Sequence, residues 1–73
     1  MANQHFSTAY LGLNIRRLRE AKGLSREAFA ELVGVTPRMV YDWENGVSCP
    51  SLQRLLVIAM VLGVSLDSLL TEM

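Results

Sequence analysis

A chain of 73 residues has room for one small domain with a single hydrophobic core. Hydrophobic residues make up 51% of the sequence and charged residues 19%, which excludes an intrinsically disordered segment and predicts spare apolar surface. The net charge is zero, but residues 1–40 carry six basic and three acidic side chains, a balance of +3, and residues 41–73 carry one basic and four acidic ones, a balance of −3. Such a separation can steer one face toward an anion, although chance also produces it in a short chain.

The sequence lacks the patterns of a metal site, a membrane span and an active site. The single cysteine, Cys49, cannot form an internal disulfide and stands in no histidine cluster, so we expect a cytoplasmic protein without metal or cofactor. The longest apolar run, residues 55–64, is about half as long as a membrane span, and residues 1–10 lack the apolar core of a secretory signal. No candidate nucleophile or carboxylate comes with a second catalytic group, so we expect no enzyme.

The first predicted helix covers residues 9–22, after an N-terminal arm of residues 1–8. Leu11, Ile15 and Leu18 recur at helical spacing and form its inward stripe. The side that is expected to point away from the core carries Asn14, Arg17 and Glu20. A glycine follows directly after this helix and can end it.

Two short helices with clear start signals come next. Ser25 is a good N-cap for a second helix over residues 26–33. Thr36 is a good N-cap for the third, and Pro37 stands at the first helical position, where its missing N–H costs nothing. The third helix continues to Glu44, before an Asn-Gly pair ends it.

The remaining sequence predicts a fourth helix after Ser51 and a short fifth helix after Ser65. We expect the inward face of the fourth helix to consist of Leu52, Leu55, Leu56 and Ala59. The fifth helix would bury Leu66, Leu69 and Leu70. No segment reads as a strand, so the predicted fold class is all-α, with five short helices in one domain over residues 9–71.

The fourth helix carries a second apolar stripe where a solvent-facing side is normally polar. This stripe consists of Val57, Met60 and Val61. It is covered either by the N-terminal segment that contains His5, Phe6 and Tyr10 or by another chain. We favour a second copy of this chain, in a homodimer through helices four and five, where a different protein partner could also dock.

Residues 11–69 resemble the phage-repressor (Cro/cI, XRE-like) helix-turn-helix family. The likeness rests on the spacing of Ala30, Gly34 and Val40 and on the motifs LREAKGLS, FAELVGV, WENG and PSL. It implies a lambda-repressor-like domain in which the third helix lies in the major groove of DNA and the second crosses above it. By the same likeness, Glu44 pairs with Arg19 and ties the first helix to the end of the third.

On the third helix, Val40 and Trp43 share the inward side. The outward side carries Arg38, Tyr41, Asp42 and Asn45. Arg38 is our first candidate for reading bases, because a guanidinium can donate to guanine O6 and N7 together. Tyr41 and Asp42 are the next candidates, since an aspartate can accept from cytosine N4 and also repels phosphate. The alternative is a plain Arg38–Asp42 ion pair on the helix surface.

The expected contacts with DNA phosphates lie at two helix ends. By the family resemblance, these contacts come from Ser25, Arg26, Asn45 and Gly46. Altogether we expect a sequence-specific transcriptional regulator, a repressor, that binds a palindromic operator in double-stranded DNA as a homodimer. The alternative is a protein-interaction module of the same fold, for example antitoxin-like, with weak or no DNA binding, which the neutral charge and the non-basic loop at residues 46–48 would permit.

Overall fold

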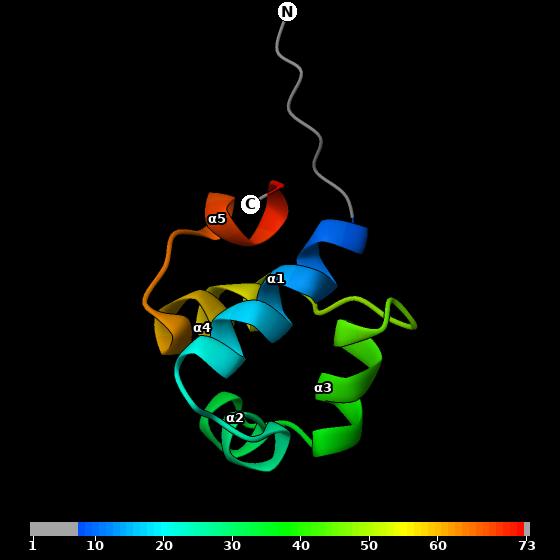
Figure 1. The fold of residues 1–73 in the computed structure, drawn as a ribbon. Coiled ribbons are helices and arrows are strands. Elements are labelled where there is room, and N and C mark those ends of the chain that lie inside the picture. Colours follow the sequence, from blue (N-terminus) through cyan, green and yellow to red (C-terminus); the bar gives the residue numbers. More distant parts are fainter. Residues whose placement is uncertain (1–7, 73) are drawn as a thin grey trace, which may run out of the picture.

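The computed structural model describes residues 8–72, and this part of the chain consists of helices and short connections (Figure 1). The helices are α1 Thr8–Ala21, α2 Arg26–Val33, α3 Pro37–Glu44, α4 Leu52–Leu62 and α5 Leu66–Leu70. The predicted all-α class with five helices is confirmed. Of the predicted N-terminal arm, residues 1–7 lie outside the described residues, and so do His5 and Phe6, which were the alternative cover for α4.

Local capping signals start and stop the helices. The N-caps of α2 to α5 are Ser25, Thr36, Ser51 and Ser65, and each side-chain oxygen accepts the N–H three residues later at 3.0 to 3.3 Å. Gly34 ends α2 with φ at 88°, and its N–H donates to the carbonyl of Ala30. Because glycine enters this left-handed conformation without strain, only three residues are needed between the end of α2 and the start of α3.

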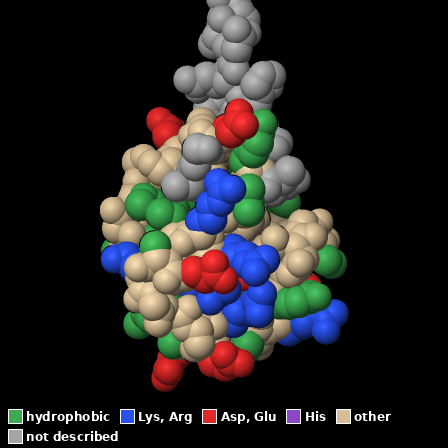
Figure 2. All heavy atoms as spheres, viewed as in Figure 1, with side chains coloured by type: hydrophobic (Ala, Val, Ile, Leu, Met, Phe, Trp, Pro, Cys, Tyr) green, Lys and Arg blue, Asp and Glu red, His purple; other side chains and the backbone are tan. Residues whose placement is uncertain are grey.

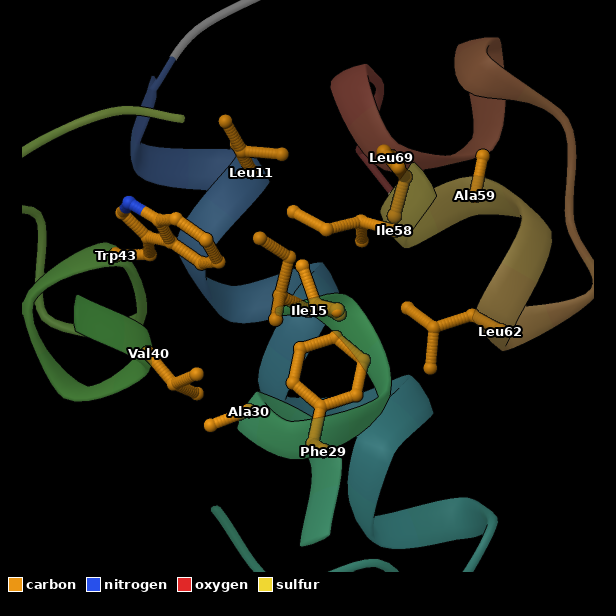
Figure 3. Packing of buried hydrophobic residues seen from close by; sticks show 11 residues of the cluster. Leu11, Ile15, Phe29, Ala30, Val40, Trp43, Ile58, Ala59, Leu62 and Leu69 are labelled. Atoms are coloured by element: carbon orange, nitrogen blue, oxygen red, sulfur yellow. The ribbon is translucent and has the colours of Figure 1, made fainter. Parts of the chain in front are cut away.

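The core lies where α1, α2, α3 and α4 meet, and α5 closes it (Figure 3). Phe29 of α2 and Ile15 of α1 lie at its centre, with Val40 on one side and Leu62 on the other. The other buried apolar residues are Leu11, Ala30, Val33, Trp43, Ile58, Ala59 and Leu69. α3 thus buries one side through Val40 and Trp43, as predicted.

The predicted inward face of α4 is partly wrong. Ile58, Ala59 and Leu62 are buried, whereas Leu52 and Leu56 are exposed. The reason is that α4 has apolar residues on nearly every side, so periodicity does not choose the buried one. Packing against α2 and α5 makes that choice.

Asn14 was predicted to point away from the core, and that prediction is wrong. Its residue surface is 1% exposed, and its side-chain Nδ2 donates to the carbonyl oxygens of Ser68, Leu69 and Thr71 at 3.2, 3.0 and 2.7 Å. The last carbonyls of a helix have no partner within the helix. The amide of Asn14 satisfies them at the end of α5 and thereby binds α5 to α1.

Backbone-to-backbone contact joins α1 to the end of α3. A Cβ at Gly12 would lie 2.5 Å from the carbonyl oxygen of Trp43 and 2.9 Å from that of Glu44. Glycine is normally unfavourable inside a helix. Here it lets α1 lie directly against the last turn of α3, a constraint that the sequence analysis missed.

Replacing Asn14 tests how far α5 depends on this amide. We expect Asn14→Ala to lower the free energy of unfolding by about 1–3 kcal/mol, because one buried and two partly buried carbonyls lose their donor. Asn14→Asp should cost more, since it places carboxylate oxygens against carbonyl oxygens. Urea unfolding followed by circular dichroism measures both, with Arg17→Ala on the exposed side of α1 as the control. Equal stabilities of Asn14→Ala and the control would contradict this role.

Candidate nucleic-acid interface

Two buried side chains determine which side of α3 faces outward. Val40 and Trp43 are buried in the core, which leaves Arg38 and Tyr41 exposed on the opposite side. The side chain of Arg38 is 79% exposed, whereas that of Asp42 is only 22% exposed. The outward side of α3 therefore offers mainly a guanidinium and a phenol ring.

Glu44, the last residue of α3, is held by two arginines from two other helices. Its side chain is 1% exposed. Arg19 of α1 donates to both carboxylate oxygens, at 2.6 Å from Nε and 3.2 Å from Nη2, and Arg26 of α2 donates from Nε at 3.0 Å. Arg19 also donates from Nη1 to the carbonyl of Leu24 at 2.7 Å. The structure thus brings together Arg19 and Glu44, and it adds Arg26, which the sequence analysis did not connect with them.

Charged side chains of both signs gather between α1 and α3 on the face shown in Figure 2. Burying a carboxylate is costly unless opposite charges and hydrogen bonds compensate for the lost water. Here the buried Glu44 has two basic partners, Arg19 and Arg26. Glu20, which lies 3.9 Å from Arg19, is also paired with Arg16 at 3.3 Å, so these three arginines and two glutamates together keep one positive charge. That charge lies where the start of α2 meets the end of α3.

Two guanidinium groups lie close to the ring of Tyr41. The Cζ atom of Arg26 is 5.3 Å from the centre of the phenol ring, and that of Arg38 is 5.7 Å from it. Both distances are in the range of cation–π interactions. Arg38 in turn donates from Nε to Oδ1 of Asp42 at 3.1 Å, so the ion pair weighed as an alternative reading of these two residues is present.

The residues that we expect to contact DNA phosphates also cap helices, turn the chain or form hydrogen bonds within the protein. The hydroxyl of Ser25 accepts the N–H of Ala28 as the N-cap of α2. Asn45 donates from Nδ2 to the carbonyl of Tyr41 at 2.8 Å, and Gly46 turns the chain with φ at 74°. Arg26 uses Nε for Glu44, which leaves its two Nη groups for another acceptor. Because Arg26 also contacts Tyr41, the start of α2 lies beside the outward side of α3.

The described part of the chain contains neither a membrane-spanning helix nor a cluster of metal-binding side chains. Over residues 8–72, no helix is both long and apolar enough to span a bilayer. The same residues contain no group of three or more histidine, cysteine or acidic side chains that could hold a metal ion.

Comparison with known proteins identifies the family. A family model described as Helix-turn-helix matches residues 15–69, which is more than half of the chain. The chain belongs to this helix-turn-helix family. An uncharacterized HTH-type transcriptional regulator of Rickettsia conorii is 37% identical over 59 residues, which cover 81% of this chain and 47% of the relative. This helix-turn-helix chain spans about half the length of the curated relatives it matches.

Solved structures share the arrangement of these helices. The restriction-modification controller protein of Aeromonas hydrophila has a TM-score of 0.79 and 35% identity, covering 85% of this chain and 94% of that protein. The P22 c2 repressor, in complex with a synthetic operator, has a TM-score of 0.79 and 30% identity, covering 82% and 91%. Hydroxypropylphosphonic acid epoxidase from S. wedmorenis also reaches 0.79, at 32% identity, but only 35% of it is covered. The helix-turn-helix fold therefore also occurs as one part of an enzyme.

Glu44→Gln tests the buried cluster at the end of α3. The change keeps the shape of the side chain but leaves the buried Arg19 with only the half-exposed Glu20, at 3.9 Å, as an opposite charge, so we expect a loss of roughly 3 kcal/mol in the free energy of unfolding. The matched control is Glu31→Gln, which removes an exposed acid from α2 and should matter by less than about 0.5 kcal/mol. Chemical denaturation measures both variants. A Glu44→Gln variant as stable as the control would show that the cluster does not hold α3.

Proposed function

We propose that this chain is a DNA-binding transcriptional regulator, a repressor, that places α3 in the major groove of double-stranded DNA. The observation that carries the proposal is the short helix α3, which the core and Glu44 hold firmly while its outward side presents Arg38 and Tyr41. Membership of the helix-turn-helix family supports it, and so does the similarity to a repressor solved with its operator.

In this proposal, the contacts divide into reading and positioning. Arg38 reads a guanine, because its exposed guanidinium can approach a base edge. Arg26 and Ser25 at the start of α2, with Asn45 and Gly46 after α3, contact phosphates. Phosphate contacts of this kind fix the position of a protein on DNA without selecting sequence.

We also propose that the regulator acts as a homodimer through α4 on a palindromic operator. The exposed face of α4, defined by Leu52, Leu56, Val57 and Met60, is apolar. Gln53 is the only polar residue among the exposed residues of α4. In a two-fold symmetric dimer, each copy contributes the same surface to the interface. An apolar face can pack against its own copy in such an isologous contact. Val61, expected on this face, packs partly against the core and contributes less.

A second candidate is a protein-interaction module of the same fold. The helix-turn-helix fold in an epoxidase shows that the fold alone does not determine function. The loop after α3 also exposes Val47, where a basic residue would attract DNA. In that case the exposed face of α4 would bind a different protein, and α3 would have weak or no affinity for DNA.

Selection from a random pool of duplexes separates the two candidates. We expect the wild-type chain to enrich a two-fold symmetric motif, and Arg38→Ala to relax one position in each half-site by about 10- to 100-fold, because one bidentate base contact is lost. Arg17→Ala, which removes the same charge from the exposed side of α1, should keep the motif. No enrichment even at low salt would favour the protein-interaction module, and a uniform loss of affinity in Arg38→Ala would remove Arg38 as a reader.

Sedimentation velocity tests the dimer independently of DNA. We expect Met60→Lys to weaken self-association by roughly 10-fold or more, because Met60 is 80% exposed in the single chain and would be buried between two copies. Leu32→Lys adds the same charge at an exposed leucine of α2 and should leave the dimer intact. A wild-type chain that sediments as a monomer, or equal effects of both changes, would rule out this interface.

A further inference from the structure

We infer that Asp42 and Tyr41 are positioning residues that hold Arg38 ready for a guanine, and that Asp42 does not itself read a base. This inference rests on the proposed function, because it concerns how α3 selects DNA sequence. It revises the sequence-based expectation that Asp42 could accept from cytosine N4.

The placement of Asp42 argues against a direct base contact. Its Oδ1 accepts from Nε of Arg38, and its side chain is largely covered while that of Arg38 extends into solvent. The main chain at this position is fixed as well, because the carbonyl of Asp42 accepts the N–H groups of Val47 and Ser48 at 2.9 and 3.4 Å. The carboxylate is therefore turned along the helix toward Arg38.

The bond to Asp42 determines which donors of Arg38 are free. A guanidinium has one Nε–H and two Nη groups, and here Asp42 takes the Nε–H. The two Nη groups remain, and a pair of parallel donors matches O6 and N7 of guanine. A phosphate that approached the same Nη groups would come close to the carboxylate and be repelled by it. The pair thus favours guanine over non-specific contact with the DNA backbone.

Tyr41 supports Arg38 from a second direction. Its ring lies within cation–π distance of Arg38, and Arg26 lies within the same distance of that ring. Arg26 is itself bonded to the buried carboxylate of Glu44. A continuous series of contacts therefore runs from the buried Glu44 through Arg26 and Tyr41 to the exposed guanidinium of Arg38. Each contact limits the rotamers of the next side chain, so less conformational entropy remains to be lost when Arg38 meets DNA.

The test compares variants on two duplexes that differ only at the guanine of the selected motif. We expect Asp42→Ala to reduce the preference for guanine at that position by about 2- to 10-fold, as for a long side chain that has lost its support. Its affinity for unrelated duplexes should stay equal or rise, because a repulsive charge near the phosphates is gone. Tyr41→Phe should keep the preference, and Tyr41→Ala should reduce it. Asp67→Asn, which removes an exposed acid from α5, is the control for charge alone.

A double mutant distinguishes positioning from reading. In the Arg38→Ala background, Asp42→Ala should have no further effect at the guanine position, because the residue that it positions is absent. Loss of preference at a separate cytosine position in Asp42→Asn would overturn the inference, and so would a uniform loss of affinity for all sequences. A wild-type chain without any sequence preference would overturn the proposed function and this inference together. A wild-type preference that Asp42→Ala leaves unchanged would overturn the inference alone.

Discussion

The buried carboxylate of Glu44 is the interaction on which the rest of this structure depends. It accepts three N–H donors from Arg19 and Arg26, so one side chain at the end of α3 is bonded to both α1 and α2. Desolvation of a carboxylate is offset only by close charges and complete hydrogen bonding, and that requirement fixes the geometry narrowly. An eight-residue helix has little stability of its own in water. α3 is therefore a helix because the surrounding structure holds it.

Two further contacts act at the same end of α3. Trp43 enters the core beside Ile15, and Gly12 of α1 lies directly against the carbonyls of the last turn. A side chain of any size at Gly12 would push α3 away and separate Arg19 from Glu44. The close approach, the ring and the ion pair therefore support one another, and together they fix the rotation of α3 about its axis. That rotation is what leaves Arg38 and Tyr41 outside.

The sequence predicts those features that short-range signals determine. Hydroxyl N-caps and positive-φ glycines mark the helix ends within a few residues, and Val40 with Trp43 identifies the inward side of α3. Asn14 was misplaced because its partners are backbone carbonyls more than 50 residues away, which no local pattern reveals. The rotation of α4 was partly misjudged because apolar side chains occur all round that helix. The bond from Arg26 to Glu44 likewise needs the tertiary arrangement of α2 and α3.

The same arrangement explains how a chain of zero net charge can present a basic surface. Both acids at the end of α3, Asp42 and Glu44, are bonded to arginines, so neither presents a free carboxylate. With the adjoining pair of Arg16 and Glu20, four arginines stand against three acids here, so the arginines are in excess by one. One excess charge gives a weak, salt-sensitive attraction to a polyanion, far below that of a surface with six or more phosphate contacts. For the proposed regulator, a second copy doubles this attraction, and the dimer binds only DNA that contains two correctly spaced half-sites. In this proposal, the apolar face of α4 and the sparsely charged face of α3 depend on each other. Dimerisation through α4 supplies the affinity for DNA that a single copy of α3 lacks.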